Sequence, residues 1–159
     1  MRRKRSKPEP DAQGGRETAL RLLSRREHSA AELKYKLGRR GHEEGQAQEI
    51  VERLGTAGWQ SDARYAEMLL RNRADRGYGP LRVRAELEAA RVADAIIRAA
   101  FEAADVDWDA RACAVHARRF GQPPQSAAEW QKQYRYLAAR GFESGQIRTA
   151  LKRDEPGAE

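Results

Sequence analysis

The sequence has little of what β-sheets, disulfide frameworks and membrane spans require. Aromatic residues make up 7 % of its 159 residues, and alanine is abundant, a balance that favours helices over strands. The single cysteine, Cys113, cannot form an intramolecular disulfide, and we expect it to pack as a small hydrophobe. No run of about 18 apolar residues occurs, so we expect an all-α protein without a membrane span. The basic start MRRKRSK is not followed by an apolar stretch, as it would be in a secretory signal, so we expect a cytosolic protein.

The motifs of common enzyme and metal sites are also missing. His28, His42 and His116 are scattered, and none shows HExxH spacing. The sequence contains no GxxxxGK[ST] phosphate loop, no GxGxxG after a strand and no GxSxG elbow. Carboxylates stand among arginines on amphipathic segments, where surface ion pairs are their ordinary role. The sequence therefore predicts no catalytic residue, no metal site and no cofactor.

The sequence has an excess of basic over acidic residues. Lys and Arg number 31 against 24 Asp and Glu, a formal net charge of +7. Basic proteins of this size commonly bind nucleic acid, an acidic protein surface or an anionic membrane. Solubility alone is the alternative explanation. A membrane surface is disfavoured, because no basic segment carries the bulky apolar face of an interfacial helix.

Short helical segments fill the chain. Ser29 precedes an apolar-periodic run and has Glu32 three residues later, which predicts a capping box. Gly58 is expected to end a later helix, Ser61 to cap the one that follows, and Pro80 to occupy a first turn. These signals predict a series of short helices joined by tight turns.

A repeat organises these segments. Leu37, Leu87 and Leu137 recur at a spacing of 50 residues, each inside a similar pattern of a preceding helix, a turn and a following helix. We predict a basic tail over residues 1–15, three-helix repeats over 16–58, 59–106 and 107–153, and an acidic end over 154–159. A unit this small cannot bury its apolar face alone, so stacked repeats should form an elongated, curved, solenoid-like array.

Basic side chains gather around the middle helix of each predicted repeat. A strip of this kind suits a long polyanion, and a solvated face is the alternative. In the second repeat the candidates are Arg64, Arg71, Arg73, Arg76, Arg82 and Arg84. In the outer repeats they are Lys34, Arg39, Arg40, Lys132, Arg135 and Arg140.

The second repeat holds the densest part of this strip. Spacing predicts an ion-pair ladder along Arg64, Glu67, Arg71 and Asp75. Arg82 and Arg84 precede carboxylates by four residues, which is the weaker orientation, so both head groups should stay available. Arg73 and Arg76 have no acidic partner except through tertiary contacts. We expect their joint charge reversal to weaken function without changing helicity or melting.

The stretch GYGP, residues 77–80, lies in the middle of this strip. Gly77 and Gly79 permit a chain reversal, and Pro80 begins the next helix, so the stretch is expected to be a structural joint. Tyr78 is the best candidate among the aromatic residues for stacking on a base. The alternative for such aromatics is a place in the core or between repeats.

The segment SDARYAEMLLRNRADRGYGPLRVRAEL resembles the central repeat of the RecX regulatory proteins. The segments ALRLLSRREHSAAELKYKL and YRYLAARGFESGQIRTAL resemble their first and third repeats, so the resemblance covers roughly residues 16 to 152. Two positions depart from the family pattern. Ser61 replaces a common acidic residue, and Arg91 stands where glycine is frequent, so a positive φ there would strain or change the turn.

The resemblance implies a non-enzymatic, monomeric protein without cofactor. It implies binding to the RecA recombinase filament and inhibition of its assembly, ATP hydrolysis and strand exchange, in the regulation of DNA repair, recombination and the SOS response. Single- or double-stranded DNA would be a secondary partner. The alternative function is a general nucleic-acid binder built of helix-turn-helix-like repeats, without specificity for the recombinase.

Overall fold

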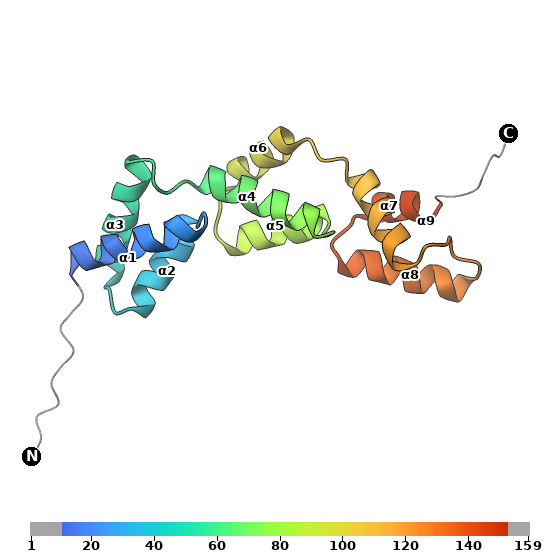
Figure 1. The fold of residues 1–159 in the computed structure, drawn as a ribbon, viewed down its shortest axis with the longest axis horizontal. Coiled ribbons are helices and arrows are strands. Elements are labelled where there is room, and N and C mark those ends of the chain that lie inside the picture. The colour runs from blue at the N-terminus through green and yellow to red at the C-terminus, as the bar shows by residue number, and fades with distance from the viewer. Residues whose placement is uncertain (1–10, 153–159) are drawn as a thin grey trace, which may run out of the picture. The chain divides into compact units, whose positions relative to one another are not determined.

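The computed structural model describes residues 11–152, and in this range the chain forms nine helices and no strand (Figure 1). The prediction of an all-α protein is confirmed. The helices are α1 (Ala12–Arg25), α2 (Ala30–Arg39), α3 (Glu44–Thr56), α4 (Asp62–Asp75), α5 (Pro80–Ala89), α6 (Asp94–Ala104), α7 (Trp108–Arg119), α8 (Ala127–Ala139) and α9 (Ser144–Leu151).

The first helix begins earlier than predicted. Asp11 caps α1 by accepting a hydrogen bond from Gly14 N at 2.6 Å, so residues 12–15 are helical and do not belong to the predicted tail. Gly15 is buried, and a Cβ there would lie 2.6 Å from Ile50 Cδ1. The glycine is therefore a packing residue of the first repeat. Residues 1–10 of the predicted tail and the acidic end over 154–159 lie outside the described residues.

The first three helices pack around one small core. Ser29 caps α2 through the predicted capping box, in which Ser29 Oγ accepts from Glu32 N at 3.1 Å. Leu33 and Leu37 point from α2 into this core. The buried apolar residues of the core are Ala19, Leu33, Leu37, Ala47, Ile50, Val51 and Leu54.

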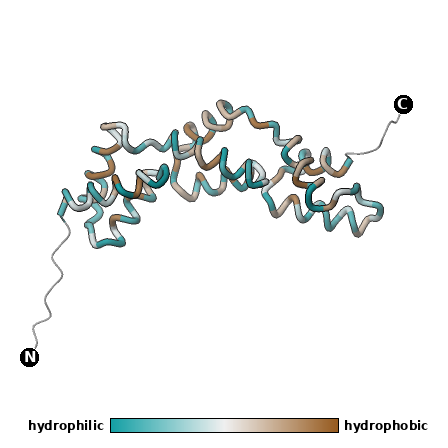
Figure 2. Tube along the Cα trace, in the orientation of Figure 1, coloured by the Kyte–Doolittle hydropathy of each residue, from teal (hydrophilic) through white to brown (hydrophobic). Residues whose placement is uncertain are grey.

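The last three helices enclose a second core. It contains Ala112, Leu137, Phe142, Ile147, Ala150 and Leu151, with Cys113 partly buried against it. The repeated leucines Leu37, Leu87 and Leu137 are all 0 % exposed, which confirms the repeat as a packing pattern. Figure 2 shows hydrophobic residues alternating with hydrophilic ones along the helices, as small amphipathic units require.

The turns after these leucines share a left-handed backbone. Gly41 and Gly141 have φ of 93° and 96°, and Arg91 takes φ of 58° at the equivalent position. Arg91 therefore keeps the turn by adopting the left-handed conformation that a side chain tolerates at a cost of about 1–2 kcal/mol. Ser61 caps α4 as predicted, because its Oγ accepts from Arg64 N at 3.2 Å.

The described residues divide into two compact units. The first extends to Tyr65 and includes 90–92, and the second comprises 66–89 and the residues from Ala93 onward. The predicted elongated, curved array stays a prediction. Among residues 11–152, no helix is both long enough and apolar enough to cross a bilayer. In the same range, no group of His, Cys, Asp and Glu side chains is placed to hold a metal ion.

Candidate partner-binding surface

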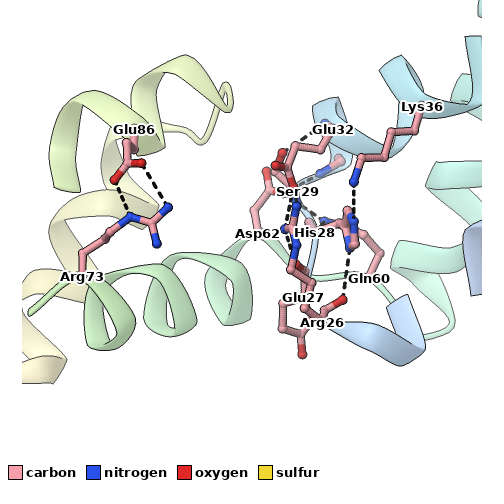
Figure 3. Close-up of polar contacts among 11 residues, drawn as sticks. Arg26, Glu27, His28, Ser29, Glu32, Lys36, Gln60, Asp62, Arg73 and Glu86 are labelled. Carbon is pink, nitrogen blue, oxygen red and sulfur yellow. Dashed lines mark hydrogen bonds and ion pairs between the residues drawn. The ribbon is translucent and has the colours of Figure 1, made fainter. Parts of the chain in front are cut away.

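Arg73, in the last turn of α4, is held by a carboxylate of α5 (Figure 3). Its Nε and Nη2 donate to the two carboxylate oxygens of Glu86 at 2.8 and 3.1 Å, and its Nη1 donates to Asn72 Oδ1 at 2.6 Å. This bidentate pair is half-buried. The expectation that Arg73 can be reversed without a change in melting is corrected, because reversal would set two carboxylates against each other.

Arg82 and Arg84 also have partners, which corrects the expectation that both head groups stay available. Arg82 Nε lies 3.9 Å from Glu86 Oε2, the carboxylate that binds Arg73. Arg84 Nη1 lies 3.6 Å from Asp94 Oδ1, and its Cζ lies 5.2 Å from the centroid of an aromatic ring, that of Phe101. Both arginines remain partly exposed. Because each lies near a carboxylate, they contribute less uncompensated positive charge than their number suggests.

Tyr78 faces two guanidinium groups of its own chain. Arg82 Cζ and Arg140 Cζ lie 4.0 and 4.2 Å from the Tyr78 ring centroid, within the range of cation–π attraction. A base that stacked on Tyr78 would have to displace one of these arginines. Base stacking at Tyr78 therefore stays a prediction, with an intramolecular competitor that the sequence did not reveal.

The turn around Tyr78 joins the second repeat to the third. Gly79 N donates to Arg140 O at 2.8 Å, and Leu81 N donates to Gly141 O at 2.9 Å. A Cβ on Gly79 would lie 2.4 Å from Gly141 C and O, so only glycine allows this approach. Gly77, with φ of 82°, supplies the reversal. The two glycines of the predicted joint therefore have different tasks.

Arg140 fastens the same joint with its side chain. Its Nε donates to Gly77 O at 3.1 Å, and its Nη2 donates to Arg76 O at 2.7 Å. Because these acceptors are neutral carbonyls, they do not compensate the positive charge of Arg140, and no carboxylate of residues 11–152 pairs with it. The Arg76 side chain itself is exposed and has no carboxylate partner among residues 11–152.

The ladder predicted along α4 gives way to tertiary pairs. Arg64 Nε donates to Glu27 Oε1 at 3.0 Å, and Asp75 Oδ1 accepts from Arg111 Nη1 at 3.2 Å. Neither Glu67 nor Arg71 takes part in an ion pair within the described residues. The prediction failed because spacing along one helix does not show the oppositely charged side chains that other elements bring closer.

The remaining candidates lie on α2 and α8 or at their ends. Arg39 Nη1 donates to a phenol oxygen, Tyr35 Oη, at 3.3 Å, and Arg40 Nη1 donates to Lys36 O at 3.3 Å. Lys34 is partly exposed, while Lys132 and Arg135 are exposed on α8. None of these five cations pairs with a carboxylate of the described chain, so their charge is available to a partner.

A buried imidazole lies beside a lysine in the first repeat (Figure 3). His28 is 2 % exposed, and its Nδ1 lies 3.1 Å from Arg26 O, an acceptor, so Nδ1 carries the proton. Its Nε2 then accepts from Lys36 Nζ at 2.9 Å. Burial lowers the pKa of His28 and also that of Lys36. Lys36 thus donates to a neutral imidazole, while Glu32 of the same cluster pairs with Arg26 at 3.2 Å.

Three arginines of α7 were missed by the sequence reasoning. Arg111, Arg118 and Arg119 line a groove together with Arg76 and Arg140. The signal was present in the run DARACAVHARRF, where two adjacent arginines follow a long interval without a carboxylate. The prediction included the first helix of the second repeat but, in the third repeat, considered only the middle helix, so it did not include α7.

Comparison with known proteins agrees with the three-repeat organisation. Models of the first, second and third three-helix domains of RecX match residues 16–54, 61–100 and 105–151. The regulatory protein RecX of Halorhodospira halophila is 45 % identical over 136 residues, covering 85 % of this chain and 84 % of that one. The regulatory protein RecX of Stenotrophomonas maltophilia strain R551-3 is 46 % identical over 149 residues, covering 93 % and 91 %.

Solved structures show the same fold. The crystal structure of RecX from Lactobacillus salivarius superposes with a TM-score of 0.73 at 22 % identity, covering 88 % of this chain and 94 % of that one. A second crystal structure of a regulatory protein RecX gives a TM-score of 0.76 at 19 % identity, covering 87 % and 72 %. With three domain models matched in order and relatives aligned over most of their length, the chain belongs to the RecX family of regulatory proteins.

Proposed function

We propose that this protein binds the RecA recombinase filament and inhibits its assembly, ATP hydrolysis and strand exchange, without catalysing a reaction itself. The observation that carries the proposal is the ordered match to all three RecX domains across nearly the whole chain. Relatives of similar length carry the description "regulatory protein". We further propose that it acts as a monomer in the cytoplasm, where the recombinase meets DNA.

The distribution of charge supports a polyanionic or acidic partner. Lys132 and Arg135 on α8 and Arg76 after α4 are exposed and lack carboxylate partners in the described chain. Such cations can approach an anionic surface without first breaking an internal ion pair. Arg73 would first have to break its bidentate pair with Glu86 to bind such a partner.

A general nucleic-acid binder is the second candidate, and the arginine groove beside α7 favours it. A salt series separates the two functions. Binding to recombinase-coated DNA should be stronger and less salt-dependent than binding to bare DNA if the filament is the partner. Equal and steeply salt-dependent binding to bare and coated DNA would contradict the filament proposal, because neutralising phosphates releases counterions.

A single substitution tests whether Arg76 lies on the binding surface. Arg76→Glu should weaken filament binding and leave the thermal midpoint unchanged, since the Arg76 side chain is exposed and its backbone carbonyl still accepts from Arg140. Arg53→Glu is the matched control, because Arg53 is exposed on α3 and pairs within that helix with Glu49 at 2.7 Å. Equal filament binding by the two variants would show that Arg76 is not on the binding surface.

A further inference from the structure

A groove rich in arginine lies between the end of α4, α7 and α8, within the second unit. Its volume is about 190 Å³. Five arginines line it, namely Arg76, Arg111, Arg118, Arg119 and Arg140. The remaining lining is mostly small or apolar, with Asp75 as the single carboxylate. Arginine does not deprotonate in proteins, so the groove carries a concentrated positive charge.

Little inside the described chain neutralises this charge. Asp75 pairs with Arg111 at 3.2 Å, and that one carboxylate faces five guanidinium groups. Arg118 and Arg76 are exposed and form no ion pair within residues 11–152. Like charges that line one groove repel one another. An external anion would relieve the repulsion, which makes the groove a candidate anion site.

Two of the guanidinium groups are held in place before any ligand arrives. Arg140 uses Nε and one Nη2 proton on the carbonyls of Gly77 and Arg76, which leaves three of its five N–H donors for a ligand. Arg119 Cζ lies 5.3 Å from the Tyr136 ring centroid, and Arg140 Cζ lies 6.0 Å from the same centroid. Tyr136 therefore positions both cations, and an ordered guanidinium loses less entropy on binding.

The groove continues past the Arg111–Asp75 pair. A neighbouring cavity of about 440 Å³ shares Ala74, Asp75 and Arg111 with it and adds Arg71 and Glu67 of α4, so it adds no net charge. The five arginines of the groove itself come from the end of α4, from α7 and from the end of α8, so its cations lie along a path and are not gathered at one point. A single carboxylate side chain would match one of them, whereas successive phosphates would match several.

We propose that this groove binds the phosphodiester backbone of single-stranded DNA, with Arg118, Arg119 and Arg140 donating to phosphate oxygens. Guanidinium groups bind phosphate through paired, charge-assisted hydrogen bonds. Strand phosphates recur at a short, regular interval, which suits cations spread along a path. Binding of the strand needs no recombinase, so this proposal stands or fails separately from the regulatory function.

The first test measures the affinity of the full chain for a labelled single-stranded oligonucleotide of mixed sequence across a salt series. The double variant Arg118→Ala/Arg119→Ala should bind more weakly, with a salt slope reduced by about 0.7 for each phosphate that is no longer neutralised. The matched control is Arg53→Ala/Arg98→Ala, which removes two charges outside the groove, each paired within its own helix. Equal salt slopes for the two double variants would overturn the proposal.

A gain of affinity provides a second test that misfolding cannot imitate. Asp75→Asn removes the single carboxylate of the groove and releases Arg111, so the oligonucleotide should bind several-fold more tightly. Unchanged or weaker binding by a folded Asp75→Asn protein would contradict a phosphate site.

The same arginine variants distinguish DNA from an acidic protein surface. If Arg118→Ala/Arg119→Ala weakens binding to recombinase-coated DNA but leaves binding to the bare oligonucleotide unchanged, the groove recognises protein and the phosphate proposal is wrong. In that outcome the proposed regulatory function would stand. If binding to bare DNA weakens, the phosphate proposal is supported whatever the coated filament shows.

Discussion

The arginines between α4 and α5 and those of the groove beside α7 are held differently. Arg73 and Arg82 converge on one carboxylate, Glu86, so their charge is largely used inside the molecule. Arg140 is held by neutral carbonyls and lies over aromatic rings, so its charge is retained. The comparison shows that the group to which an arginine binds inside the molecule, and not the number of arginines, decides where positive charge remains for an external partner.

Each of these two groups of arginines lies near a buried leucine. Replacing either leucine should have the largest effect on the free energy of unfolding. Leu87 lies on α5 beside Glu86, Leu137 lies on α8 near Arg140, and both are 0 % exposed. We expect Leu87→Ala and Leu137→Ala each to lower the free energy of unfolding by about 2–5 kcal/mol, through lost burial and a cavity. Chemical denaturation measures this, and a loss below about 1 kcal/mol at either site would contradict its place in the core.

The joint that holds Arg140 should be the next most sensitive. Gly79→Ala would place a Cβ 2.4 Å from the Gly141 backbone, and we expect a loss of about 1–3 kcal/mol from this overpacking. Gly38→Ala is the control, because a Cβ at that helical position meets nothing within 4 Å and should stabilise by about 0.5–1 kcal/mol. Thermal melting of both variants checks the difference, and equal midpoints would contradict the close joint.

Removing the carboxylate-held arginine should have a smaller effect on stability, yet a measurable one. We expect a double-mutant cycle of Arg73→Ala and Glu86→Ala to give a coupling energy of about 1–2 kcal/mol, above that of an exposed pair, because this bidentate pair is half-buried. The exposed pair Arg98–Asp94 on α6 should couple by about 0.5 kcal/mol or less. Equal coupling in the two cycles would remove the distinction between fold-holding and free arginines.

The smallest expected effect concerns the buried imidazole of His28, which lies beside Lys36 in the first repeat. The folded protein lowers the pKa of His28 below its unfolded value of 6.5, so the unfolded chain binds more protons as the pH falls. Stability from neutral His28 is therefore complete above pH 6.5 and is lost as the pH decreases from there. Burial is the main cause of the lowered pKa; the hydrogen bond to the Arg26 carbonyl and the charge of Glu32 favour protonation of the ring, and the charges of Arg26 and Lys36 oppose it.

The variant His28→Gln removes this titration. Unfolding free energies measured on both sides of pH 6.5 should fall on acidification more in the parent protein than in His28→Gln. His42 and His116 are present in both proteins and cancel in the comparison. An identical pH dependence of the two proteins would show that His28 does not contribute.

The fold could be predicted because its signals are local and repeated. The leucines at 37, 87 and 137, the capping box at Ser29 and the proline that begins α5 each report on neighbouring residues. The unusual turn at Arg91 could also be predicted, because Arg91 stands where the family pattern often has glycine, and its φ is indeed positive. The start of α1 was missed because Gly14 and Gly15 resemble a flexible segment, while Gly15 is small to fit against Ile50.

The candidate surface was less accessible to sequence reasoning. The partner of Arg73 lies 13 residues away on another helix, and the partners of Arg140 lie 63 and 64 residues away. No spacing rule for one helix reveals such pairs. The sequence could therefore identify where basic residues are dense, whereas the separation of fold-holding arginines from free ones required the tertiary contacts.

The most direct measurement of the central claim is the rate of DNA-dependent ATP hydrolysis by the recombinase in the presence of the purified protein. Regulation of the filament predicts that the rate falls progressively as the full chain is added at constant DNA and recombinase. An unchanged rate, at protein concentrations where binding to the coated filament is saturated, would contradict the account.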